Sequence, residues 1–144
     1  MSGSLFGDDV SRAAKDEAIV AAYELAGRTL DDLPYTDEFE TLMSEVKKTD
    51  DSARHREVFH RLHNLRKAGK LPRLGRGSST PPSISYEDQQ LLIGFVAEEA
   101  GSLGQRDRLP YTDGFDKVLG AFKNETGLNL THHDAWRVIA KLAK

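Results

Sequence analysis

A seven-residue motif occurs twice in this chain, and the repetition constrains the fold more than any other feature. Residues 33–39 read Leu-Pro-Tyr-Thr-Asp-Glu-Phe, and residues 109–115 differ only in having glycine where the first copy has glutamate. Beyond the motif, apolar positions also correspond once the second copy is allowed one extra residue. Val58, Phe59, Leu62 and Leu65 correspond to Ala135, Trp136, Ile139 and Leu142. A unit of about 60 residues is therefore duplicated.

The duplication predicts how the chain is divided. A length of 144 residues accommodates one average domain or two small ones, and the duplication favours two. We expect a first unit at residues 1–77, a linker rich in Ser and Pro at residues 78–84, and a second unit at residues 85–144. These units are called the first and second repeat below. Each alone buries only about 60% of its unfolded surface, so we expect the repeats to pack against each other.

Apolar residues recur at helical spacing in three segments of each repeat, which predicts an all-α fold. In the first repeat the expected helices run from Asp8 or Asp9 to about residue 26, from Thr36 or Asp37 for about three turns, and over about residues 54–68. The second repeat shows the same order, with Ser85 and Thr131 as expected caps. Pro and Gly interrupt residues 70–77, which we expect to be extended or to form a short β-hairpin.

Each repeat, with its second and third helices separated by a short turn, resembles a helix-turn-helix unit, and residues 69–77 give the first a winged-helix-like end. The resemblance implies that the third helix lies in the major groove of DNA and that the wing contacts phosphates. On the side of the third helix opposite its apolar face lie Arg56, His60, His63, Asn64 and Lys67. On the expected wing lie Lys70, Arg73 and Arg76. These eight residues are the predicted nucleic-acid-binding residues.

Charge is distributed unevenly along the chain. The formal net charge is −3, but residues 53–77 carry eight Lys or Arg and one acid, for a charge of +7, which leaves −10 for the remainder. Such a basic block suits a nucleic acid, an acidic protein surface, or simply a solvated face that complements the acidic remainder of the chain. An overall acidic charge is unusual for a dedicated DNA-binding protein, because the body of the protein repels phosphates.

Other chemistry finds little support in the sequence. The chain has no cysteine, and His60 and His63 lack a carboxylate at ligand spacing, so we predict no metal site and no cofactor. There is no Gly-rich phosphate loop after a strand and no nucleophile elbow, so we predict that the protein is not an enzyme. We interpret the repeated motif as structural, with its Leu and Tyr in the core, its Pro ending the connector and its Thr or Asp capping a helix.

The sequence therefore predicts a DNA-binding protein that acts mainly through the first repeat, while the second repeat stabilises the first, forms a homodimer or adds weak phosphate contacts. The alternative is a protein-protein adaptor with two docking units, whose basic block meets an acidic partner. No apolar run reaches 18 residues and the first nine residues lack signal-peptide features, so we expect a cytoplasmic location without membrane contact. The last helix ends abruptly, so the chain could also be a fragment of a longer protein.

Overall fold

The structure, a computed structural model, describes residues 4–74 and 80–144, with side chains described from Arg12 onward. Within these ranges every regular element is a helix, which confirms the predicted all-α class. The elements are α1 (Ser4–Ala26), η1 (Leu30–Asp32), α2 (Asp37–Lys47), α3 (His55–Lys67), α4 (Tyr86–Ala100), η2 (Leu103–Arg108), α5 (Asp113–Thr126) and α6 (His132–Leu142), where η denotes a 3-10 helix. None of these helices is long and apolar enough to cross a membrane.

Side-chain caps fix where four of the helices begin. The hydroxyls of Thr36, Ser85, Thr112 and Thr131 each accept a hydrogen bond from the backbone N–H three residues further on. Such a cap satisfies a donor that the helix itself leaves unpaired and contributes about 1 kcal/mol. The caps predicted for these helices are therefore confirmed. Helix α1 differs from the prediction, because it begins at Ser4 and not beside Asp8 or Asp9.

The expected wing is only partly described. Residues 70–74 contain no strand, and Gly75, Arg76 and Gly77 lie outside the described residues. Lys70 and Arg73, two of the predicted phosphate-binding residues, are exposed. Within the described part, the β-hairpin that we allowed for is therefore absent. The repeat boundaries proposed near residues 77 and 85 stay predictions.

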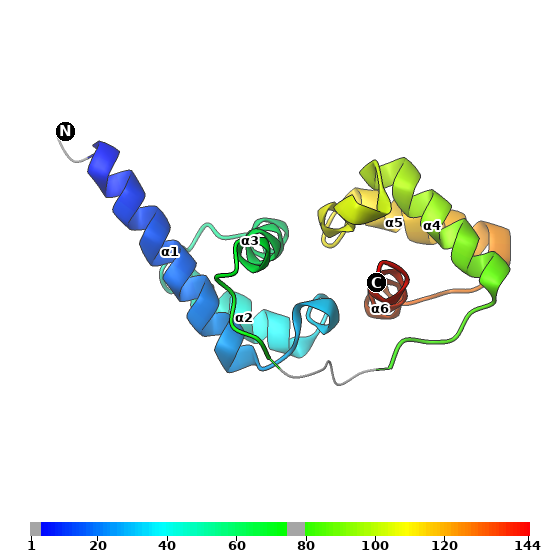
Figure 1. The fold of residues 1–144 in the computed structure, drawn as a ribbon, viewed down its shortest axis with the longest axis horizontal. Coiled ribbons are helices and arrows are strands. Elements are labelled where there is room, and N and C mark those ends of the chain that lie inside the picture. Colours follow the sequence, from blue (N-terminus) through cyan, green and yellow to red (C-terminus); the bar gives the residue numbers. More distant parts are fainter. Residues whose placement is uncertain (1–3, 75–79) are drawn as a thin grey trace.

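Helices α1, α2 and α3 lie in one half of the molecule, and α4, α5 and α6 lie in the other (Figure 1). In each half the apolar stripes predicted from sequence spacing face inward. Buried side chains include Phe39, Leu42, Met43 and Val46 on α2, and Val58, Phe59, Leu62 and Leu65 on α3. One hydrophobic cluster joins both halves, because Phe59 lies edge-on to Trp136 with ring centroids 5.3 Å apart. The two repeats therefore share a core.

Contact between the repeats and a candidate nucleic-acid interface

The repeated motif brings the two repeats together. The backbone N–H of Tyr35 donates to the hydroxyl of Tyr111, and the N–H of Tyr111 donates to the hydroxyl of Tyr35. Their rings stack with centroids 4.2 Å apart. Both residues have φ of 64°, a left-handed conformation that costs a bulky side chain roughly 1–2 kcal/mol. The reciprocal hydrogen bonds and the stacking offset this strain, so the motif meets its own copy at a local two-fold axis.

Two histidines at equivalent positions extend the pair of tyrosines into a column of four rings. His55 lies 4.9 Å from the ring of Tyr111, and His132 lies 4.9 Å from the ring of Tyr35. Each imidazole also bonds a carboxylate on the second helix of its own repeat. His55 contacts Glu40, and His132 lies 2.7 Å from Asp116. The pairing of ring against ring is therefore repeated on both sides of the axis.

Away from the axis, α3 packs its predicted DNA-reading side against η2 of the second repeat. The Nδ1 atom of His60 lies 2.9 Å from Oδ2 of Asp107, and Asn64 contacts the imidazole of His60 at 3.3 Å. His63 is only 3% exposed, with its ring 4.7 Å from that of Phe59. Two of the predicted base-reading positions thus face the other repeat, because His60 bonds Asp107 and the ring of His63 lies edge-on to that of Trp136 at 6.2 Å.

The expectation that His63 lies on the exposed side of α3 is wrong, because its side chain is buried. The cause of this error is that the helical periodicity of α3 was interpreted against the core of one repeat, so the side that the second repeat covers was counted as solvent-facing. Burial, assisted by the positive charge of Arg66, lowers the pKa of His63 to about 3. The imidazole is therefore neutral near pH 7 and cannot provide a cation for a phosphate.

The equivalent side of α6 packs against η1 of the first repeat and carries cations that meet carboxylates. His133 lies 2.9 Å from Oδ1 of Asp32, a fully buried carboxylate that Arg137 also contacts. Lys144 lies 3.1 Å from Asp31. Although burial raises the pKa of Asp31, hydrogen bonds and charges of Lys144 and Arg66 bring it below its usual value. The acids of η1 therefore pair with cations in and just after α6 and also with Arg28 and Arg66 of their own repeat.

The connecting helices η1 and η2 carry opposite net charge. The α6–η1 contact and the α3–η2 contact are therefore equivalent in position but differ in electrostatics. Helix η1 has the sequence Leu-Asp-Asp, whereas η2 ends in Arg106, Asp107 and Arg108. Asp107 is the only acid in η2, and it bonds His60. On α3, Arg56 and Lys67 are exposed, and they form no ion pair with any residue that the structure describes; the same is true of Arg108. The charge of Lys67 acts on Asp107. We call Arg56, Lys67 and Arg108, three exposed cations on α3 and on the η2 helix that packs against it, the basic face.

The predicted binding residues do not gather on one surface. Arg56 and Lys67 belong to the basic face, and the side chain of His60 on the same helix is 54% exposed. Lys70 lines a groove with Asp16 of α1, and Arg73 lines a cavity with Tyr23. Arg108 was missed by the sequence analysis. Its basic connector is visible in the sequence, but it gains meaning only once η2 is placed beside α3.

Within the described part of the chain, no group of three or more His, Asp or Glu side chains is arranged to hold a metal ion. Comparison of the chain with protein-family models, with curated proteins and with solved structures gave no match. Functional inference therefore depends on the geometry and charge of the basic face.

Proposed function

We propose that the protein binds double-stranded DNA through the basic face, and that it holds phosphates more than it reads base edges. The observation that carries the proposal is the charge difference between two equivalent contacts. The acids of η1 pair with Arg137 of α6 and with Lys144 just after it, whereas η2 adds Arg108 to the cations of α3. The cations of the basic face form no ion pair with a described residue, unlike Arg137 and Lys144, so they can supply the electrostatic attraction that phosphate binding requires.

The spacing of the cations fits a duplex. Arg56 and Lys67 are eleven positions apart on one helix, which is roughly 16 Å at a rise of 1.5 Å per residue. The major groove is about 12 Å wide, so the two side chains can reach phosphates on both of its edges. The resemblance to a helix-turn-helix unit stays part of this proposal, with one change. His60 bonds Asp107 of the other repeat and His63 is buried, which leaves few side chains for base recognition and predicts weak sequence preference.

The proposal is tested by fluorescence anisotropy with a random-sequence DNA duplex at several salt concentrations. The test variant is Arg56→Gln, Lys67→Gln, Arg108→Gln. Its matched control is Lys47→Gln, Lys123→Gln, Lys141→Gln, which removes the same charge from exposed residues elsewhere. Each lost phosphate contact lowers the slope of log K against log salt by about 0.9, so the test variant should lose about 2.7 and the control much less. Equal binding by the two variants would refute the basic face as the DNA site.

One observation favours a second candidate function, the binding of an acidic protein. Two of the predicted base-reading residues are not available to DNA bases, because His60 bonds Asp107 of the other repeat and His63 is buried, while Arg56, Lys67 and Arg108 are exposed. A protein partner needs the positive surface but not base readout. This alternative predicts no duplex binding even at low salt, and a partner that the intact chain and the control variant retain but the test variant loses.

A further inference from the structure

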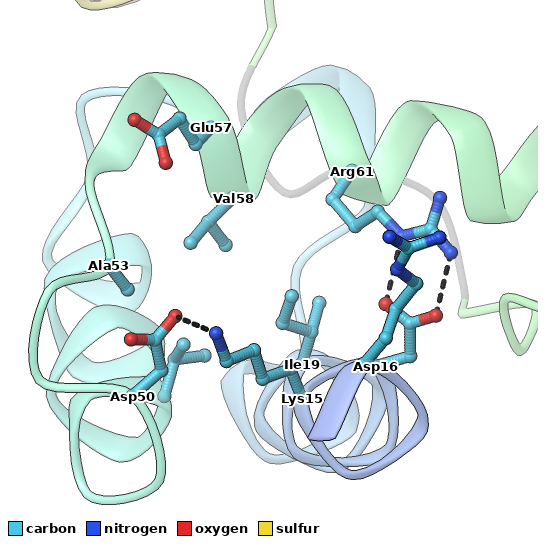
Figure 2. A pocket seen from close by; sticks show the side chains of 10 residues that line it. Lys15, Asp16, Ile19, Asp50, Ala53, Glu57, Val58 and Arg61 are labelled. Carbon is cyan, nitrogen blue, oxygen red and sulfur yellow. Dashed lines mark hydrogen bonds and ion pairs between the residues drawn. The ribbon is translucent and has the colours of Figure 1, made fainter. Parts of the chain in front are cut away.

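A cleft of about 390 Å³ opens in the first repeat between α1, the turn after α2, and α3 (Figure 2). Its floor is apolar and its rim is charged. The floor is formed by Ile19, Val46, Ala53 and Val58. The rim is formed by Arg12, Lys15, Asp16, Asp50, Glu57 and Arg61. The volume lies within the range of small-molecule sites, and an aromatic ring fits an apolar cavity of about 150 Å³.

The second repeat shows that this space is not required by the fold. Val46, Ala53 and Arg61 correspond in the aligned repeats to Phe122, Leu130 and Val138. Phe122 is fully buried and Val138 is 4% exposed. The second repeat thus places larger apolar side chains at two of these positions and replaces the charged one. At Val46 and Ala53 the first repeat has the smaller residues, although at Val58 it has the larger one, because the equivalent residue is Ala135.

Some charged side chains of the rim form hydrogen bonds or ion pairs with one another. Arg61 donates two hydrogen bonds to Asp16, at 2.8 and 2.6 Å, and the pKa of Asp16 is lowered chiefly by this bond. Asp50 accepts a hydrogen bond from Ser52 at 2.8 Å and lies 3.7 Å from Lys15. Figure 2 shows the Lys15–Asp50 pair and the Arg61–Asp16 pair on different sides of the cleft.

The cations that remain available favour an anionic ligand. Arg12 forms no ion pair with any described residue, although its charge acts on Asp16, and Lys15 lies 3.7 Å from Asp50. They lie three positions apart on α1, so they share one side of the helix. Glu57, the third acid of the rim, is exposed and lies 3.9 Å from Arg54, which is also exposed. Two cations thus stand above an apolar floor.

We propose that this cleft binds a free small molecule of the aromatic carboxylate class. The ring would lie on Val46, Ala53 and Val58, and the carboxylate would meet Arg12 and Lys15. This site is separate from the basic face, so the proposal does not depend on DNA binding.

The experiment titrates phenylacetate into the intact ¹⁵N-labelled protein and follows backbone amide shifts by NMR. We expect saturable shifts at the cleft residues with a dissociation constant in the millimolar range or tighter, as suits a ligand of this size. The neutral analogue phenylacetamide should bind about tenfold more weakly or worse, because it cannot form charge-assisted hydrogen bonds. An absence of saturation by phenylacetate at tens of millimolar would overturn the proposal, as would equal binding of the two compounds.

Two variants locate the site. Val46→Phe with Ala53→Leu reproduces the second repeat and should abolish binding while the circular dichroism spectrum stays that of a folded helical protein. Arg12→Gln should weaken phenylacetate binding about tenfold without changing phenylacetamide binding, and Lys123→Gln on the exposed side of α5 is its charge control. Binding that survives the filled cleft, or that Arg12→Gln and Lys123→Gln weaken equally, would place the ligand elsewhere and refute the assignment.

Discussion

Removing one tyrosine hydroxyl at the local two-fold axis should weaken the contact between the repeats by a predictable amount. In Tyr35→Phe the ring and its stacking on Tyr111 are kept, but the backbone N–H of Tyr111 loses its acceptor. In Tyr111→Phe the N–H of Tyr35 loses its acceptor in the same way. The two variants therefore test the same interaction from its two sides.

The magnitude follows from the burial of the orphaned N–H groups. A fully buried donor without a partner costs about 1–3 kcal/mol. Tyr35 and Tyr111 are half-buried, so water can partly replace the lost acceptor, and the lower half of the range applies. We expect each variant to lose about 1–1.5 kcal/mol of unfolding free energy. For a chain of this length that lowers Tm by about 4 °C. The double variant should lose about 2–3 kcal/mol.

Urea denaturation followed by tryptophan fluorescence is a suitable assay, because the only tryptophan, Trp136, is fully buried against Phe59 of the other repeat. Burial raises the pKa of Tyr35 to about 12 and raises that of Tyr111 as well, so both hydroxyls stay protonated at neutral pH. Tyr86→Phe is the matched control, since Tyr86 is 72% exposed and should change stability by less than about 0.5 kcal/mol. Single variants as stable as this control, or costs that differ by more than about 1 kcal/mol, would refute the reciprocal contact.

Two further substitutions test the buried charged groups. Burial holds the pKa of His63 near 3, below the unfolded value of about 6.5, so only the unfolded chain gains this proton at intermediate pH and stability falls on acidification by up to about 1.4 kcal/mol per pH unit. Between pH 7 and pH 5, His63→Gln should therefore lose about 1 kcal/mol less unfolding free energy than wild type, measured from urea midpoints. This pH window lies above the range where Asp107 is protonated. An equal loss in the two proteins would contradict the prediction. Asp32→Asn should lower the free energy of unfolding by about 3 kcal/mol, because it leaves Arg137 beside a neutral group. The exposed control Asp51→Asn should lower it by less than about 0.5 kcal/mol. A loss below about 1 kcal/mol for Asp32→Asn would contradict the prediction and show that water replaces the carboxylate.

The sequence was sufficient for features that depend on local chemistry. Apolar spacing on α2 and α3 identified Phe39, Phe59 and their neighbours as buried, and Thr36 was recognisable as a cap because its hydroxyl serves the adjacent helix. It was not sufficient where the two repeats meet. The left-handed backbone of Tyr35 depends on a partner 76 residues away, and no spacing within either repeat encodes that distance.

The candidate site was predictable only in part for the same reason. Arg56 and Lys67 were found because they lie opposite the apolar stripe of α3, but His63 lies on that side too and is buried by the second repeat. Periodicity locates the side of a helix and cannot say which neighbour covers it. Arg108 was missed because a basic residue in a connector carries no signal until the connector is packed against α3.

The duplication also explains how one protein can hold two equivalent contacts that differ in charge. Residues at the axis must match their own copies, because Tyr35 and Tyr111 each supply what the other needs, and the motif has accordingly stayed nearly identical. Residues away from the axis meet a different partner in each contact, so no such reciprocity restricts them. There the repeats diverge, with aspartates in η1 and arginines in η2. The shared geometry holds the repeats together, and the divergent charge leaves α3 as the side that can attract an anionic partner.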